Sequence, residues 1–322
     1  MQMLNEAQVA ERLREQDHIL ILTHRRPDGD TIGCAAGLCC ALRQIGKQAW
    51  VFPNEDATDL FTPYLEGLQA PDGWEPSFVV AVDVAERQML PPSANVWADR
   101  IDLVIDHHPS NPLYGKENCV DASCAACGEI LYDICRHLGE ITPEVALPLY
   151  LAVSTDTGCF VYNNTTERTH RVAADLLKYG IDYQAVNKRH FRTKSFRRLK
   201  LEAMMVSGLE LLQEGTLAIG SISLADMAAI GARETDVEDI AAFIGQIEGV
   251  CSSVTIRELK PGECKLSVRT DPNKLNATNV CALLGGGGHA AAAGCTVNGS
   301  VQDARDAIVK AIETIQTGNT NN

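Results

Sequence analysis

Aspartate and histidine side chains follow short apolar runs in this sequence. The clearest case is residues 104–108, Val-Ile-Asp-His-His, where an apolar run ends in one carboxylate and two imidazoles. If this run is a buried parallel strand, Asp106, His107 and His108 lie at its carboxyl end, where open α/β sheets bind their ligands. Imidazole beside carboxylate suits a divalent transition metal. A purely structural polar pair would give the same pattern, so further residues are needed.

Three other stretches place the same residue types after predicted strands or helices: His24, Asp28 and Asp30 after 19–23, Asp83 in 78–84, and Asp156 in 154–158. Grouped carboxylates repel one another and are costly to bury without a counter-charge. Two divalent cations would relieve that conflict, and metals about 3.5–4 Å apart suit phosphoester hydrolysis. A mixed aspartate and histidine set favours Mn²⁺, with Mg²⁺ or Co²⁺ as substitutes.

The strands and helices that must position these groups predict an α/β fold. Apolar runs predict strands of a mainly parallel, doubly wound sheet at 19–23, 48–52, 78–84 and 101–106. Amphipathic patterns predict helices at 7–16, 32–45, 125–138, 143–155 and 166–179. Asp30 or Thr31 is the expected N-cap of the helix at 32–45. The carboxyl ends of parallel strands share one edge, so the polar groups can converge there.

The second half of the chain predicts a smaller α/β domain. Strands are expected at 216–223, 253–259 and 265–270, and helices at 224–231, 237–249, 276–284 and 301–315, with a frayed tail at 317–322. Residues 188–200 carry seven Lys or Arg side chains. A solvated connector is the favoured interpretation of that segment, and an electropositive wall that steers phosphates is the alternative. The predicted domains are 1–187 and 213–322, joined by a helical linker at 188–212.

Composition restricts the class of protein further. The net charge of −14 argues against a duplex-DNA binder, which would present a dominant basic field. Apolar runs of about 18 residues are absent, and the first residues lack a signal-peptide pattern, so we expect a cytoplasmic protein without a membrane partner. The twelve scattered cysteines, including Cys124 and Cys127 in a CxxC spacing, are interpreted as buried thiols rather than disulfides.

Taken together, these stretches resemble the DHH phosphoesterase superfamily. The matching pieces are the spaced His24, Asp28 and Asp30, Asp83 at a strand end, the DHH tripeptide itself, and Asp156 in STDTG. The glycine run 285–288, followed by His289 and Gly294, resembles the signature of the type 1 DHH-associated C-terminal domain. The resemblance covers nearly the whole chain. Its compact length is similar to that of the superfamily's oligoribonuclease and pAp-phosphatase branch.

The resemblance implies a dinuclear manganese site in which Asp83 bridges the two ions. One ion would be held by His24, Asp28 and Asp83, and the other by Asp30, Asp83, His107 and Asp156. Asp106 would orient an imidazole, as metal-binding histidines usually require. His108 would face the scissile phosphate and assist the leaving group.

The resemblance also implies a substrate site in the C-terminal domain, with the active site in the cleft between the domains. Ser267, Arg269 and Thr270 match a stretch that holds the substrate's far phosphate, for which arginine supplies bidentate geometry. Residues Gly286, Gly287 and Gly288 would let backbone N–H groups approach a phosphate closely. His289 would contact the scissile phosphate.

The implied function is a phosphoesterase that cleaves short single-stranded oligoribonucleotides to 5′-mononucleotides and converts adenosine 3′,5′-bisphosphate (pAp) to AMP. Dinucleotides are further expected substrates, and a homodimer is an expected assembly. Two alternatives remain at this stage. One is a phosphodiesterase for cyclic or linear dinucleotides, and the other is a catalytically silent nucleotide sensor. Complete retention of the expected ligands disfavours the sensor.

Overall fold

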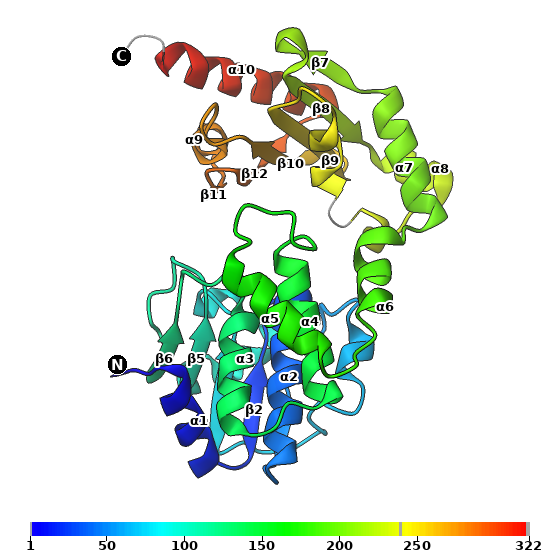
Figure 1. Ribbon diagram of the computed structural model, residues 1–322. Helices are drawn as coiled ribbons and strands as arrows, with labels where there is room; N and C mark the ends of the chain where they lie inside the picture. Colours follow the sequence, from blue (N-terminus) through cyan, green and yellow to red (C-terminus); the bar gives the residue numbers. More distant parts are fainter. Residues whose placement is uncertain (1, 238–239, 320–322) are drawn as a thin grey trace. The chain divides into compact units, whose positions relative to one another are not determined.

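The computed structural model describes residues 2–237 and 240–319. The chain divides into two compact units, Met1–Thr193 and Lys194–Asn322, called here the first and second domains (Figure 1). The predicted linker at 188–212 contains this division. It comprises the π-helical turn η4 (Lys188–Arg192), helix α7 (Phe196–Ser207) and the short strand β7 (Glu210–Leu212).

The first domain is built on a six-stranded sheet in which every paired strand runs parallel. The strand order is β1-β6-β5-β4-β2-β3. The strands are β1 (Gln2–Met3), β2 (Ile19–Leu22), β3 (Ala49–Val51), β4 (Phe78–Val82), β5 (Leu103–Asp106) and β6 (Glu117–Val120). The prediction of a mainly parallel α/β sheet is therefore confirmed.

Side chains of the central strands alternate between two apolar layers, as the period of a strand requires. Ile19 and Ile21 of β2 pack into a large core with the helices, whereas Leu20 and Leu22 pack into a smaller core on the other face. The helices are α1 (Glu6–Glu15), α2 (Gly29–Gln44), α3 (Cys127–Leu138), α4 (Pro143–Asp156), α5 (Glu167–Leu177) and α6 (Tyr183–Asn187). Short 3₁₀ segments occur at η1 (Thr62–Leu65), η2 (Arg87–Met89) and η3 (Pro92–Arg100), and η3 helps to cover the smaller core.

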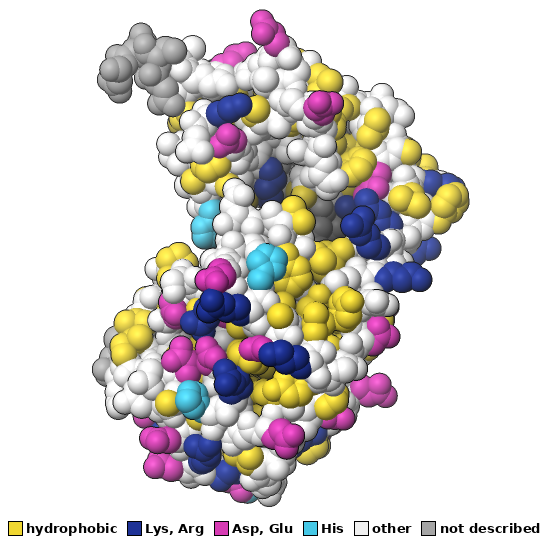
Figure 2. Space-filling model, in the orientation of Figure 1, with side chains coloured by type: hydrophobic (Ala, Val, Ile, Leu, Met, Phe, Trp, Pro, Cys, Tyr) yellow, Lys and Arg dark blue, Asp and Glu magenta, His cyan; other side chains and the backbone are white. Residues whose placement is uncertain are grey.

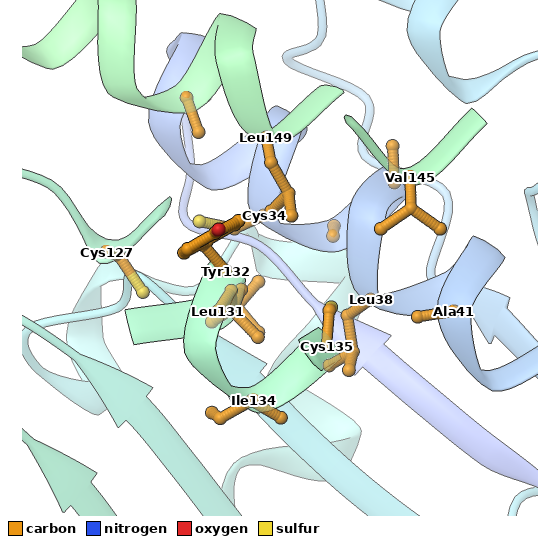
Figure 3. Close-up of a cluster of buried hydrophobic side chains, with 14 of the residues drawn as sticks. Cys34, Leu38, Ala41, Cys127, Leu131, Tyr132, Ile134, Cys135, Val145 and Leu149 are labelled. Atoms are coloured by element: carbon orange, nitrogen blue, oxygen red, sulfur yellow. The ribbon is translucent and has the colours of Figure 1, made fainter. Parts of the chain in front are cut away.

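Helix α2 lies at the centre of the large core and is buried along most of its length. Figure 3 shows its Cys34 and Leu38 among side chains from α3 and α4, including Leu131 and Leu149. The described cysteines are all free thiols, and most are buried, as predicted. A thiol of this kind packs as a small hydrophobic group.

The second domain contains a six-stranded sheet of order β11-β12-β10-β9-β8-β7, in which only the pair β8·β9 is parallel. Its strands are β7 (Glu210–Leu212), β8 (Leu217–Ile222), β9 (Ser252–Lys260), β10 (Glu263–Thr270), β11 (Gly287–His289) and β12 (Ala292–Asn298). Helices α9 (Ala277–Ala282) and α10 (Val301–Asn319) pack on one core, and α7 and α8 (Leu224–Ile230) on another. The shortest helical turns are η5 (Gln213–Gly215), η6 (Glu234–Asp236), η7 (Ile240–Ala242) and η8 (Ile244–Gln246).

Several element predictions are wrong. The N-cap of α2 is Asp28, not Asp30 or Thr31, because the Asp28 side chain accepts from the backbone N–H groups of both. The helix predicted at 237–249 is replaced, in its part from 240 onward, by the 3₁₀ turns η7 and η8; residues 238–239 lie outside the described residues. Residues 317–319 continue α10 instead of fraying, and 320–322 of the predicted frayed tail are not among the described residues.

Helices in the described part of the chain are all too short or too polar to cross a membrane. On the face shown in Figure 2, acidic and basic side chains are interspersed over the first domain.

Candidate metal centre

The ends of three neighbouring strands and two helices deliver the predicted ligands. His24 follows β2, Asp83 follows β4, and Asp106 is the last residue of β5. Because these strands are adjacent and parallel, their carboxyl ends share one edge of the sheet. The start of α2 packs on the end of α4 without room for a side chain, since a Cβ on Gly29 would lie 2.3 Å from the Thr155 Oγ1 atom. This close approach brings Asp30 of α2 towards Asp156 of α4.

The structure gathers the predicted metal ligands into overlapping groups. Their ligand atoms form three overlapping groups within 4.8 Å: His24, Asp28 and Asp83; Asp30, His107 and Asp156; and Asp83, His107 and His108. The His107 Nε2 atom lies 3.5 Å from Asp83 Oδ1 and 3.7 Å from Asp156 Oδ2. The His24 Nε2 atom lies 3.6 Å from Asp28 Oδ1. The assignment of these side chains to two ions stays a prediction.

Two of the three histidines at the cluster, His24 and His107, are each held in one tautomer. The Nδ1 atom of His24 is 2.9 Å from the Arg25 carbonyl oxygen, and that of His107 is 3.2 Å from the Cys124 carbonyl oxygen. A carbonyl oxygen can only accept, so each Nδ1 carries the proton. The Nε2 lone pair of each ring is thereby directed at the acidic cluster, as for a histidine that binds a metal.

Burial and mutual repulsion make the charged form of the central carboxylates unfavourable. Burial, together with repulsion from Asp156 and Asp28, raises the pKa of Asp30 well above its usual value. Burial and the charges of Asp30 and Asp28 do the same to the pKa of Asp83. The Asp83 Oδ1 atom is also buried without a hydrogen-bond partner among the described residues. A divalent cation would satisfy that oxygen and reverse the local repulsion, so the residues present fit a metal.

The Asp30 carboxylate is anchored by a segment far away in the sequence. It accepts hydrogen bonds from the backbone N–H groups of Cys127, at 2.7 Å, and Gly128, at 3.0 Å, in the first turn of α3. Cys34 donates its thiol proton to the same carboxylate at 3.2 Å. Helix N-termini attract negative charge, which explains why a buried aspartate is tolerated there.

A hydrogen-bonded chain orients His108 next to the cluster. The His108 Nδ1 atom lies 2.8 Å from Asp106 Oδ1, and Asn111 donates to the other Asp106 oxygen at 2.6 Å. Burial acts to raise the pKa of Asp106, but the hydrogen bonds and charge of His108, with the amide of Asn111, hold that pKa below its usual value. The Asp106 carboxylate thus contacts one ring nitrogen of His108, and its role in catalysis stays a prediction.

The predicted substrate residues of the second domain share one face of its sheet. Residues 264, 266 and 268 of β10 face the core, so Ser267 and Arg269 point to the opposite face. Pairing places Arg269 beside Ala292 of β12, and Ala292 beside His289 of β11. Directly paired residues point the same way. Arg269 and His289 are therefore neighbours across a single small residue, and their substrate contacts stay a prediction.

The glycine run leads into strand β11. Residues 287–289 form β11 and pair with β12, while Gly285 turns with φ of 73°. A Cβ on Gly286 would lie 2.3 Å from the Gly294 carbonyl oxygen, and Gly288 has φ of 142°. Close strand packing thus requires glycine at these positions. Thr270 borders the run and donates its hydroxyl proton to the Ala290 carbonyl oxygen at 3.1 Å.

The basic stretch at 188–200 is largely paired within the protein. Arg197 contacts Asp236 at 2.8 Å, and both Lys194 and Arg198 contact Glu202 at 2.8 Å. These contacts favour a structural role for this part of the stretch over an electropositive wall.

Sequence reasoning missed the residues that hold the ligands in place. Asn111 was missed, although it follows the DHH tripeptide by three positions and its amide suits a carboxylate partner. Asn54 donates to Thr23 at 2.8 Å and to the His24 carbonyl oxygen at 2.9 Å. The backbone donors of Cys127 and Gly128 have no signal in side-chain patterns, because any residue type supplies an N–H group.

Comparison with known proteins identifies the family of both domains. Residues 18–153 match the DHH family, N-terminal domain, and residues 223–317 match the DHHA1 domain. A crystal structure of an exopolyphosphatase-related protein from Bacteroides fragilis superimposes with a TM-score of 0.86 at 23% sequence identity, over 97% of this chain and 96% of that chain. At this identity the likeness demonstrates the fold alone.

Two sequence relatives cover nearly the whole chain. The bifunctional oligoribonuclease and PAP phosphatase NrnA of Thermus thermophilus is 34% identical, over 94% of this chain and 92% of the relative. The protein of the same name from Bacillus subtilis is 24% identical, over 93% and 95%. With both family domains in order and a relative of this identity along its length, the chain belongs to the DHH family and is a hydrolytic phosphoesterase.

Proposed function

We propose that this protein hydrolyses short oligoribonucleotides to 5′-mononucleotides and pAp to AMP. The supporting observation is the buried cluster of aspartate and histidine around the unpartnered Asp83 Oδ1 atom. The Thermus thermophilus relative, whose name states both activities, aligns along almost the entire chain.

The metal in this proposal is a pair of divalent cations, with manganese favoured by the mixed donor set. His24, Asp28 and Asp83 would hold one cation, and Asp30, Asp83, His107 and Asp156 the other. Bound cations would supply positive charge for the phosphate oxygens and make water more acidic. The protein's own contribution is to keep the ligands pre-arranged through the hydrogen bonds of His24, His107 and Asp30.

His108 is proposed to protonate the leaving oxygen. Its Nδ1 atom is engaged by Asp106, so its Nε2 atom is the one available to a substrate. Asp106 would fix the orientation of the ring, as a carboxylate does for histidine in other acid–base catalysts. The His108 side chain is 29% exposed, which leaves it accessible to a ligand.

The two domains are proposed to have different roles in catalysis. Residues 1–187 carry the metal chemistry, and residues 213–322 bind the substrate. In the second domain, Arg269 would take the terminal phosphate with Ser267 and Thr270. The backbone of Gly286, Gly287 and Gly288, with His289, would contact phosphate oxygens. Arginine suits a terminal phosphate because its planar guanidinium donates two parallel hydrogen bonds.

A substrate panel tests the proposal. The full chain with Mn²⁺ is given 5′-phosphorylated dinucleotides, pAp, cyclic dinucleotides and pyrophosphate, and the kcat/KM values are compared. We expect the first two to be the best substrates. Preference for cyclic dinucleotides would move the assignment to the phosphodiesterase alternative. Cleavage of pyrophosphate without cleavage of any nucleotide would overturn it.

Asp83→Ala separates an enzyme from a silent sensor. Removing the carboxylate common to two ligand groups should lower kcat by at least about a thousandfold, because phosphate charge is no longer neutralised. Asp99→Asn is the matched control, since the Asp99 side chain is 95% exposed at the surface. If the wild type and Asp83→Ala bound nucleotides equally well and the wild type showed no turnover, the sensor would be favoured instead.

A further inference from the structure

The segment that follows the proposed metal ligand Asp156 exposes two apolar side chains. Asp156 ends α4, and residues 157–166 connect it to α5 (Figure 1). Within this connection, Val161 is 78% exposed and Tyr162 is 57% exposed. A large apolar side chain gains nothing from contact with water, so two consecutive exposed ones call for an explanation.

The backbone of this connection is strained. Gly158, Cys159 and Phe160 follow one another with φ of 54°, 58° and 67°. For the two that carry a Cβ, this left-handed conformation is unfavourable. Such strain persists only where surrounding structure enforces it, and it concentrates at ligand-binding sites.

Hydrogen bonds fix the strained segment directly to the end of α4. The backbone N–H groups of Val161 and Tyr162 both donate to the Thr157 carbonyl oxygen, at 2.9 and 3.0 Å. The Asn164 amide donates to the carbonyl oxygens of Asp156 and Ala125, each at 3.0 Å. Asp156, a proposed metal ligand, is thus joined by hydrogen bonds to the segment that carries Val161 and Tyr162.

Two aromatic rings of the segment have different roles. Phe160 is anchored in the domain, where it stacks on His170 at 5.4 Å between ring centroids and borders the large core. The ring of Tyr162 lies on Gly158 instead, so closely that a Cβ there would be 2.5 Å from the Tyr162 Cζ atom. Tyr162 is therefore a positioned ring that keeps more than half of its surface exposed.

We propose that Tyr162 is the stacking platform for a nucleobase of the substrate, so that this subsite binds the planar heterocycle adjoining the cleaved phosphate. The proposal rests on the phosphoesterase function proposed above. Stacking on a tyrosine is a base-tolerant interaction, because every nucleobase has a π-face. The subsite should hence accept purines and pyrimidines with modest discrimination, which suits an enzyme that clears short RNA of any sequence.

Substrates with and without bases test the platform. The full chain with Mn²⁺ is given a 5′-phosphorylated dinucleotide and its abasic analogues, which lack one base or both. The readout is the ratio of kcat/KM for the normal and abasic substrates. Tyr162→Ala should reduce this ratio about tenfold or more, whereas Tyr162→Phe should retain it. Val161→Ala is the matched control, because it shortens the neighbouring exposed side chain without removing a ring.

Calorimetry supplies a measurement that needs no turnover. AMP and ribose 5-phosphate share a phosphate and a sugar and differ by the base, so the ratio of their affinities isolates base binding. Wild-type protein should prefer AMP, and Tyr162→Ala should lose that preference. If no phosphoester is cleaved but this pattern holds, the proposed function fails while the platform stands. Equal loss of normal and abasic substrates in Tyr162→Ala, or an unchanged AMP preference, overturns the platform.

Discussion

Several side chains of the candidate site are oriented by a second group, which binds the ring nitrogen or carboxylate oxygen that faces away from the cluster. The histidines of the metal centre are aimed by backbone carbonyl oxygens, and His108 is aimed by Asp106. Asp106 in turn depends on Asn111, whose amide nitrogen is 2.6 Å from its second oxygen. Positioning groups of this kind usually affect activity by one to two orders of magnitude without touching the substrate.

Asn111→Ala should lower kcat about 10–100-fold with a smaller effect on KM. The change removes a donor to Asp106, so His108 is held less firmly while every proposed metal ligand remains. Steady-state kinetics with pAp measure the effect, and Mn²⁺ binding by calorimetry should change little. Ser110→Ala is the control, because Ser110 directly precedes Asn111 and is exposed. A kcat within twofold of wild type would contradict the positioning role.

The grouping of these side chains could be predicted at this scale because several of them follow an apolar run, and parallel strands bring such positions together. Asp83 is one example, buried directly after β4. Tyr162 could not be found in this way, since its significance lies in the left-handed turn at residues 158–160 and in the ring's contact with Gly158. Backbone conformation and surface exposure of this kind are set by tertiary structure.

Helix α2 is the element on which the metal centre depends most. It contributes Asp30, is capped by Asp28, and is tied to β4 by the hydroxyl of Thr31, which donates to the Val82 carbonyl oxygen at 2.9 Å. Glycines on its buried side let α4 approach closely. A Cβ on Gly33 would lie 2.2 Å from the Pro148 carbonyl oxygen and 2.8 Å from the Ala152 nitrogen.

Gly33→Ala should destabilise the first domain by about 1–3 kcal/mol, because the added methyl meets backbone atoms of α4 that cannot move independently. Gly37→Ala is the matched comparison, one turn along the same helix. There the added methyl meets the end of the Leu149 side chain at 2.8 Å, which can rotate away. Alanine also favours a helix over glycine by about 1 kcal/mol.

Urea unfolding followed by circular dichroism measures both variants. The free energy of unfolding should fall clearly more for Gly33→Ala than for Gly37→Ala. The prediction is wrong if the two variants lose the same stability.

The turn η4 carries a histidine that should make stability depend on pH. Burial, with the charge of Arg189, lowers the pKa of His190 from 6.5 to about 4, and its Nε2 atom is 3.0 Å from the Tyr64 hydroxyl. Between those values the unfolded chain binds more protons at this position than the folded chain. Its contribution to stability is therefore complete above pH 6.5 and is lost as the pH falls towards 4.

His190→Gln should remove this part of the pH dependence. Below pH 6.5 the free energy of unfolding of the wild type should fall more steeply than that of the variant, by at most roughly 1.4 kcal/mol per pH unit and less where water screens the ring. Denaturation at several pH values between 4 and 8 gives the comparison. Parallel curves for the two proteins would show that His190 does not titrate differently on folding.

Prediction of elements succeeded where a hydrophobic period was long and unbroken. Helix α3, predicted at 125–138, is an example, with Ile130, Leu131, Ile134 and Leu138 buried at helical spacing. It failed at 240–249, where Gly245 and Gly249 interrupt an apolar pattern and the chain forms 3₁₀ turns against β9. It also missed β12, since the alanine and glycine residues at 290–294 have low strand propensity and are held there by pairing with β10.

At the scale of the whole molecule, each domain has its own hydrophobic core. Two clusters of buried side chains lie within residues 9–186 and two within residues 201–312. The proposed metal ligands belong to the first domain alone. Metal binding should therefore stabilise one domain selectively, because a ligand stabilises only the folded unit that binds it.

Mn²⁺ should raise the melting temperature of one of two unfolding transitions. At a concentration of about one hundred times Kd, the first domain gains roughly 2.7 kcal/mol, and the second gains none. Differential scanning calorimetry with increasing Mn²⁺ measures the shift, and Asp83→Ala supplies the control without a complete site. An equal shift of both transitions, or the same shift in Asp83→Ala, would contradict the assignment.

The anchoring of Asp30 by the start of α3 has a consequence for how the protein matures. The two groups are 97 residues apart, and the remaining ligands reach from His24 to Asp156. During synthesis, a nascent chain that has emerged only as far as β5 would hold an incomplete ligand set, with the Asp30 carboxylate lacking its backbone donors. Such contacts form only after long loops of the chain have closed. We therefore expect metal binding to follow the docking of α3 on α2, and not to initiate that docking. Metal loading would thus act as a quality check that distinguishes completed first domains from unfinished ones.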